Sequence, residues 1–139
     1  MTKKQYDEVV VFTDGGARGN PGPAALGVAI YEPNGTLIDT YGEYLGEQTN
    51  NYAEYSALVY ALKQAKKLGA KKVTCKMDSE LIVKQLAGEY RVRNEGLIPL
   101  FADVKKFACD FEEISFSHVR REYNKMADKM VNSILDRMV

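Results

Sequence analysis

Cysteine, histidine and tryptophan are scarce in this sequence, which has two cysteines, one histidine and no tryptophan. Cys75 and Cys109 are far apart and belong to no CxxC motif, so neither a disulfide framework nor a zinc site is indicated. This cysteine content is typical of a reducing compartment, and we expect a cytoplasmic protein.

Long hydrophobic runs are missing as well. The N-terminal segment MTKKQYDEVVVFTD contains a lysine pair and an apolar run of only four residues, which is too short for a signal peptide. No stretch approaches the length of a membrane-spanning helix. We therefore expect no membrane partner.

An excess of charge of one sign is also absent, because 19 lysines and arginines balance 19 aspartates and glutamates. A neutral total weakly disfavours a nucleic-acid partner. If four of the 19 acids were grouped around divalent cations, 15 would remain against 19 bases, and the rest of the protein would be net positive by four. The total charge therefore decides little.

What the chain contains is the composition of an ordinary globular domain. Of its 139 residues, 45% are hydrophobic and 27% are charged. A domain of this length can bury a core without disulfides or a structural zinc. No internal repeat, low-complexity tract or long linker divides the sequence. We expect one domain over residues 1–139, present as a monomer.

Three strand-like segments open the chain. Residues 8–14 form a β-branched and aromatic run without polar alternation, as in a strand covered on both faces. The segment GGARGNPGP that follows is typical of a loop. Asn34-Gly35 between two further strand-like runs, at 25–32 and 36–45, predicts a hairpin. Together these segments predict an antiparallel meander.

The sequence period then changes to that of an amphipathic helix. Small and apolar residues recur every three or four positions from Asn51 to Leu68, with Asn50 or Asn51 as the expected N-cap and Gly69 as the expected stop. The remaining expected elements are a strand over 71–78, a helix capped by Ser79 and closed by Gly88, a helix over 96–109, a strand over 112–118 and a last helix over 124–139, whose inner stripe is Met126, Ala127, Met130, Val131, Ile134, Leu135 and Met138.

This order of elements, βββαβα(α)βα, predicts an α/β fold. Strand–helix–strand units imply parallel pairing through right-handed crossovers, and the opening meander adds antiparallel strands. The expected result is a mixed sheet with helices on both faces. Sites in such sheets normally lie outside the carboxyl ends of the central strands.

Four acidic residues lie where such a site is expected. Asp14 and Asp78 end two predicted strands, whereas Glu54, in the first turn of its helix, and Asp128, beside Ala127, share the apolar side of their helices. Turn chemistry, capping and the helix dipole are the alternative explanation for each acid taken singly. Their convergence favours a metal site, because inward-facing carboxylates are costly unless a positive charge joins them. Oxygen ligands with little cysteine or histidine make Mg²⁺ or Mn²⁺ the expected cofactor.

Four sequence blocks carry a family resemblance: DGGARGNPGPAALGVAIY, TNNYAEYSALVYAL, MDSELIVKQL and HVRREYNKMADKMVN. In this order they resemble type 1 ribonuclease H, in the compact form of its archaeal-like and short bacterial branch, and they cover nearly the whole chain. The resemblance implies a ribonuclease H-like fold, a mixed five-stranded sheet of order 3-2-1-4-5. It also implies an endoribonuclease that hydrolyses the RNA strand of RNA/DNA hybrids and leaves 5′-phosphate and 3′-hydroxyl ends.

The resemblance further implies roles for individual residues. The metal-binding acids of the family fall on Asp14, Glu54, Asp78 and Asp128, which would hold two ions during catalysis, and its mobile histidine falls on His118. For His118 the alternative is an ordinary surface histidine, and for the asparagines it is turn and cap chemistry. Residues expected to contact the hybrid are Gly15, Gly16, Arg18, Asn20, Thr49, Asn50, Asn51, Glu80 and Asn124.

The sequence also departs from the family. The connector GEYRVRNEGLIPL stands where many members carry a basic protrusion with tryptophans, and Arg91 and Arg93 are its only bases. Glu47 occupies a position where relatives can have a basic phosphate ligand. We therefore expect modest affinity for the hybrid unless other bases, such as Arg120 and Arg121, compensate.

Other classes of function stay open at this stage. A nuclease of the same fold could also cut double-stranded RNA, or could act on DNA as resolvase and exonuclease relatives do. A catalytically silent nucleic-acid binding module, or a piece of a retroelement polymerase, is the non-enzymatic alternative. Silent versions should lack one or more of the four acids, all of which are present here.

Overall fold

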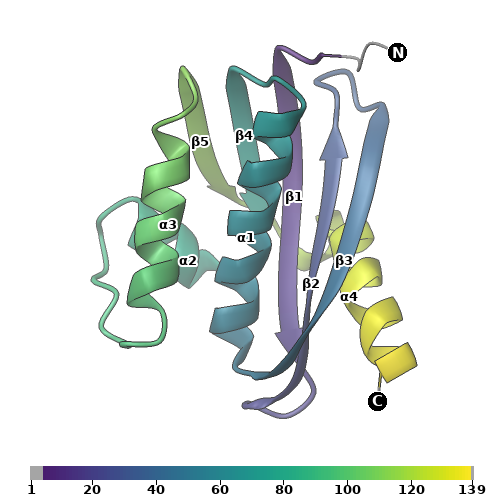
Figure 1. Ribbon diagram of the computed structural model, residues 1–139, viewed down its shortest axis with the longest axis vertical. Coiled ribbons are helices and arrows are strands. Elements are labelled where there is room, and N and C mark those ends of the chain that lie inside the picture. The colour runs from purple at the N-terminus through teal and green to yellow at the C-terminus, as the bar shows by residue number, and fades with distance from the viewer. Residues whose placement is uncertain (1–4, 139) are drawn as a thin grey trace.

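The computed structural model describes residues 5–138, and Figure 1 shows their arrangement. No helix in this part of the chain is long and apolar enough to cross a membrane. In chain order the elements are β1 (Glu8–Ala17), β2 (Gly22–Tyr31), β3 (Leu37–Gln48), α1 (Asn50–Lys67), β4 (Lys72–Met77), α2 (Glu80–Leu86), α3 (Ile98–Ala108), β5 (Glu113–His118), the short 3₁₀ helix η1 (Arg121–Tyr123) and α4 (Lys125–Met138).

The strands form one mixed sheet in the order β3-β2-β1-β4-β5. β2 pairs antiparallel with both β1 and β3, whereas β4 pairs parallel with both β1 and β5. The parallel pairs require crossovers, which run through α1 and through α2 and α3. The predicted α/β fold and the strand order 3-2-1-4-5 are confirmed.

Helices cover both faces of this sheet (Figure 1). The side chains of β2, which alternate between the two faces, show the same arrangement. Leu26 belongs to the main core with Leu58 of α1, whereas its neighbour Ala25 packs with Val131 and Leu135 of α4. Because successive residues of a strand point to opposite faces, α1 and α4 lie on opposite sides of the sheet. The expectation of helices on both faces is confirmed.

The prediction of a loop over GGARGNPGP is wrong for part of this segment. Gly15 to Ala17 continue β1 and pair with β2, whose first residues are Gly22 and Pro23. Gly15 serves close packing here, because a Cβ at this position would lie 2.2 Å from the backbone carbon of Ala53 in α1. Only the short turn between the two strands remains a loop.

The N-cap of α1 is Thr49, and the prediction of Asn50 or Asn51 is therefore wrong by one or two residues. Thr49 has extended backbone angles, and its hydroxyl accepts a hydrogen bond of 3.1 Å from the Tyr52 amide. The other predicted signals of helix and hairpin ends are confirmed. Gly69 and Gly35 adopt φ of +81° and +94°, and the Ser79 hydroxyl caps α2.

The inner stripe of α4 is predicted correctly except at its end. Ala127, Val131 and Leu135 are buried, but Met138 is 56% exposed. The small apolar cluster beneath α4 ends at Leu135, so the last turn has nothing further to cover. Val139, the last residue of the predicted helix, lies outside the described residues.

Candidate active site

The register of β1 and β4 places Asp14 and Asp78 side by side. The last Cα pair of these parallel strands joins Thr13 to Met77, and each acid is the next residue along its chain. β4 ends at this point, whereas β1 continues to Ala17. The prediction that Asp14 ends its own strand is therefore wrong, but the acid lies where its parallel neighbour ends.

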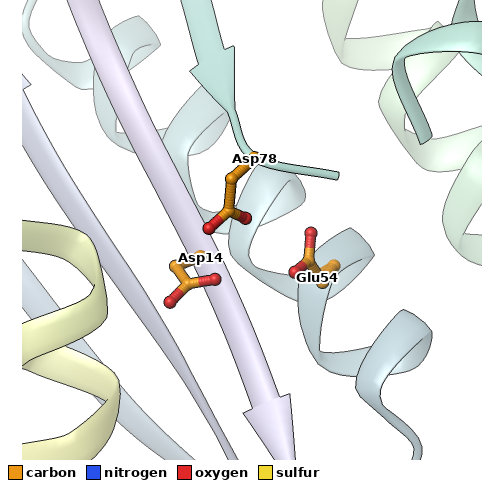
Figure 2. A group of neighbouring side chains, drawn as sticks. All are labelled: Asp14, Glu54 and Asp78. Carbon is orange, nitrogen blue, oxygen red and sulfur yellow. The ribbon is translucent and has the colours of Figure 1, made fainter. Parts of the chain in front are cut away.

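Glu54 approaches the same point from α1. Since α1 starts at Asn50, Glu54 lies just beyond the first turn in which it was expected. One carboxylate oxygen from each of Asp14, Glu54 and Asp78 lies within 4.8 Å of the others. Figure 2 shows the three groups around one shared space, reached from β1, from α1 and from the end of β4. Residues far apart in sequence thus form one carboxylate cluster.

Asp128 reaches Asp14 from the first turn of α4. Its charge and a side-chain hydrogen bond both act on the carboxyl group of Asp14. Its side chain is 32% exposed, and its Oδ1 lies 3.8 Å from Nη2 of Arg121. Asp128 is not one of the three mutually close ligands, so the fourth predicted acid lies at the margin of the cluster.

The clustered carboxylates repel one another where little water reaches them. Burial, followed by the charges of Asp78 and Asp128, raises the pKa of Asp14 to about 8. Burial, followed by the charges of Asp14 and Asp78, raises the pKa of Glu54 to about 9. The pKa of Asp78 is raised by burial above all, although the positive charge of Arg121 opposes the rise. The positive charge near the three carboxylates is therefore too small to balance them when they are ionised.

This donor set fits a hard divalent cation. Such cations prefer carboxylate oxygens, several of which meet here at close range. The raised pKa values of Asp14 and Glu54 indicate that the positive side chains of the protein, Arg121 among them, do not balance the cluster. The three carboxylates could hold a metal ion, with Asp128 next to them.

The acids line a polar hollow of about 430 Å³, bounded by β1, α1 and α4. Its wall also carries Arg18, Asn50, Arg121 and Asn132. The guanidinium of Arg18 pairs with Asp136 of α4 at 2.5 Å. The hollow is larger than a metal ion requires, and its rim presents both a cation and amide groups to a ligand.

Two of the predicted hybrid-binding asparagines join the end of β1 and the β1–β2 loop to the start of α1. The Asn20 side-chain oxygen accepts a hydrogen bond of 3.0 Å from the Asn50 amide, and the Asn50 side-chain oxygen accepts one of 2.8 Å from the Ala17 amide. These structural bonds join segments that are distant in sequence, and they are not the local turn and cap chemistry that was the alternative to substrate contact. Both side chains are nevertheless exposed beside the hollow, so the two roles are compatible.

The other predicted contact residues lie at different depths. Gly15 is buried against α1, whereas Gly16, Thr49 and Asn51 are half-buried. Glu80 is exposed and forms an ion pair of 3.3 Å with Lys84, one turn further along α2.

His118 is exposed at the end of β5, next to the acidic site. Its Cα pairs with that of Met77, the residue before Asp78. Its positive charge is among the causes that lower the pKa of Asp78. The lone histidine therefore lies beside the carboxylates, as expected, and can move without disturbing the core.

Asn124 is the predicted contact residue that the structure removes from the surface. It is 1% exposed, and its side-chain amide donates a hydrogen bond of 2.8 Å to the Thr13 carbonyl. Its Oδ1 is buried and has no hydrogen-bond partner among the described residues. A side chain in this position joins the start of α4 to β1, directly before Asp14, and its burial favours a structural role over contact with a substrate.

Asn132 and Asp136 were missed at the sequence level. Asn132 lines the hollow and donates to the Asp128 carbonyl at 3.1 Å, while Asp136 holds Arg18. A signal was available, because both residues follow Asp128 at intervals of four and therefore share its side of α4. The partner of Asp136 could not be inferred, since it lies in a distant loop.

Comparison with known proteins gives consistent matches. The sequence model of a family described as reverse transcriptase-like matches residues 12–134. Ribonuclease HI of Halobacterium salinarum is 36% identical over 92% of this chain and 64% of its own length. The crystal structure of RNase H1 from that archaeon superimposes with a TM-score of 0.91 at 35% identity, covering 94% of this chain and 98% of the other.

Two further proteins are similar over almost all of this chain. LC11-RNase H1, isolated from compost and solved in complex with an RNA/DNA hybrid, has a TM-score of 0.89 at 41% identity over 94% of this chain and 98% of its own. The bifunctional protein Rv2228c of Mycobacterium tuberculosis is 37% identical over 93% of this chain. The match covers only 36% of that mycobacterial protein, so this chain spans about a third of its length.

Proposed function

Because this chain belongs to the type 1 ribonuclease H family, we propose that it is an endoribonuclease that hydrolyses the RNA strand of RNA/DNA hybrids. The observation that carries the proposal is the cluster of Asp14, Glu54 and Asp78, whose oxygens approach within 4.8 Å at the point where β4 ends. The hybrid bound to the similar LC11 enzyme supports the same substrate class here.

The cofactor in this proposal is Mg²⁺ or Mn²⁺, held as two ions by Asp14, Glu54, Asp78 and Asp128. Bound ions of this kind supply an activated water and stabilise the leaving oxygen of an in-line displacement, which leaves 5′-phosphate and 3′-hydroxyl ends. Asp14 would be the central ligand of this set, because it is the most buried of the acids and interacts with both Asp78 and Asp128.

His118 assists proton transfer or product release without being a ligand. An imidazole exchanges protons near neutral pH, and this one is exposed beside Asp78 at the end of β5. A mobile group at the rim of the site accelerates turnover, whereas the carboxylates are required for it. We place His118 in this accelerating role.

In this proposal, residues at the rim of the hollow recognise the hybrid. A hybrid presents a wide minor groove in which only one strand carries 2′-hydroxyls. The exposed amides of Asn20 and Asn50 lie at the loop and helix start beside the acids, where they can hydrogen-bond to those hydroxyls. Arg18 on the same rim contacts a phosphate, and its pairing with Asp136 fixes its direction.

A substrate panel tests this proposal. End-labelled RNA is offered as a single strand, in an RNA/DNA hybrid and in an RNA duplex, with a labelled DNA duplex beside them, in the presence of Mg²⁺ or Mn²⁺. We expect cleavage of the RNA in the hybrid and product RNAs that carry a 5′-phosphate. Cutting of the RNA duplex as well would widen the substrate class, whereas an intact hybrid would overturn the proposal.

A further inference from the structure

A second hollow, of about 330 Å³, lies near the acidic site and shares none of its lining residues. Its lining is mostly apolar and aromatic and includes Val10, Phe12, Tyr31, Lys76, Tyr123 and Met126. This volume is at the lower end of what a small ligand occupies. None of these residues takes part in the function proposed above.

The two hollows are neighbours along β1 and along the segment that leads into α4. Phe12 and Asp14 lie two residues apart in β1, so their side chains share one face of the sheet about 7 Å apart along the strand. Arg121 lines the acidic hollow, and Tyr123 lines the second one. The buried Asn124, which is bonded to Thr13, forms part of the wall of the second hollow. A strand of nucleic acid that leaves the acidic site on this side therefore meets the second hollow first.

The chemistry of the second hollow combines flat rings with one cation. Phe12 and Tyr31 meet edge to face with centroids 5.4 Å apart, and Nζ of Lys76 lies 5.7 Å from the centroid of the Phe12 ring. Tyr123 is 68% exposed and so presents its ring to solvent. Glu32 is the single acid in the lining and lies at the hairpin end, next to Pro33.

We propose that this hollow binds an unpaired nucleotide at a single-stranded end of the hybrid substrate. The base stacks against Tyr123 and Phe12, its phosphate pairs with the ammonium of Lys76, and Glu32 accepts a hydrogen bond from an N–H group of the base. Aromatic rings beside a cation are the usual means of binding single-stranded nucleic acid. The inference rests on the proposed function, because the adjacent hybrid is what delivers the nucleotide.

Steady-state cleavage of matched substrates tests the proposal. A blunt hybrid is compared with hybrids that carry a short single-stranded extension of RNA or of DNA at either end, and with one whose extension lacks bases. We expect one of the base-bearing extensions to lower KM roughly tenfold relative to the blunt hybrid. The arm that responds identifies the strand, and the extension without bases should give little of the effect.

Variants separate the hollow from the rest of the surface. Tyr123→Ala and Lys76→Met should abolish the advantage of the extension while cleavage of the blunt hybrid continues unchanged. Tyr90→Ala is the matched control, because Tyr90 is another exposed tyrosine, and the ammonium of Lys84 lies 5.3 Å from its ring centroid. It should keep the advantage. Equal KM values for blunt and extended hybrids in the wild type would overturn the proposal.

A binding measurement keeps this test independent of catalysis. Adenosine 5′-monophosphate is titrated into labelled protein, with ribose 5-phosphate and adenosine as the arms that lack the base or the phosphate. We expect amide NMR shifts centred on Phe12, Lys76 and Tyr123 for the nucleotide, and their loss in Tyr123→Ala. Absence of those shifts would contradict the inference even if the blunt hybrid is cut, and failure to cut the blunt hybrid would contradict only the proposed function.

Discussion

Asp14 and Asp78 lie side by side because each directly follows one member of the last Cα pair between β1 and β4, Thr13 and Met77. Two parallel strands that end their pairing together thus deliver two carboxylates to one place. Glu54 completes the group because Gly15 lets α1 come close to β1 at the same level. Strand register and helix approach, and not a local motif, create the cluster.

Replacing Asp14 by asparagine should stabilise the metal-free protein at pH 8. Burial and neighbouring charges raise the pKa of Asp14 from 3.8 to about 8. A carboxyl group whose pKa is raised on folding contributes stability that is fully present below pH 3.8 and is lost as the pH rises toward 8. Asparagine escapes this loss, so we expect a gain on the order of 2 kcal/mol at pH 8 that shrinks toward pH 4.

Urea unfolding in EDTA at the two pH values measures that gain. Asp110→Asn is the control, because Asp110 pairs with Lys66 on the surface at 3.0 Å and surface ion pairs contribute little. A gain for Asp14→Asn that is larger at pH 4 than at pH 8 would contradict the account of charge repulsion.

Gly15→Ala should disrupt the packing of α1 on β1, whereas Gly16→Ala should not. A Cβ on Gly15 would lie 2.2 Å from the Ala53 backbone carbon and 2.4 Å from the Glu54 nitrogen, but a Cβ on Gly16 would have its nearest contact at 3.6 Å, with Val131. We expect a loss of about 3 kcal/mol or more for the first change and less than about 1 kcal/mol for the second. Thermal unfolding of both variants checks this, and equal losses would show that the close approach does not matter.

Asn124→Ala should destabilise the protein and weaken the site together. The change removes the hydrogen bond to the Thr13 carbonyl and leaves a cavity where the buried side chain lay between β1 and the start of α4. We expect a loss of about 2 kcal/mol. Asn132→Ala, which removes an exposed side chain of the same type from α4, should cost less than about 0.5 kcal/mol. Denaturant unfolding compares the two variants, and a substrate-contact role for Asn124 would instead leave stability unchanged and raise KM.

His118→Ala should slow turnover without abolishing it and without changing the fold. The side chain is exposed at the end of β5, so its removal leaves the core intact. Loss of a proton-exchanging group typically costs a factor of about 10² to 10⁴ in turnover. Single-turnover and steady-state rates on the hybrid, with thermal unfolding as the control, check this. An unchanged rate would assign His118 to an ordinary surface position.

The sequence was most informative where periodicity or turn chemistry is local. Asn34-Gly35 marked its hairpin, the repeat of apolar residues marked α1, and Ser79 marked the start of α2. It misled where a residue type has two uses. The glycines of GGARGNPGP were interpreted as loop residues, although Gly15 serves the contact between a strand and a helix.

Part of the candidate site was predictable, because local sequence patterns place some of its residues. Asp78 follows a strand and Glu54 lies on the inner side of a helix, and both placements follow from the local pattern. The marginal position of Asp128, the burial of Asn124 and the pairing of Arg18 with Asp136 depend on how α4 packs against β1 and its loop. Those contacts join residues more than a hundred positions apart, which one sequence does not specify.

The proposed function requires the carboxylate cluster to bind divalent cations that promote cleavage of the RNA strand of a hybrid. The most direct test measures cleavage of an end-labelled RNA/DNA hybrid by the wild type and by Asp14→Asn, first in EDTA and then after addition of Mg²⁺ or Mn²⁺. We expect the wild type to be inactive in EDTA and active with either metal, while the folded Asp14→Asn variant stays inactive throughout. Cleavage by Asp14→Asn at the wild-type rate, or undiminished wild-type cleavage in EDTA, would contradict it.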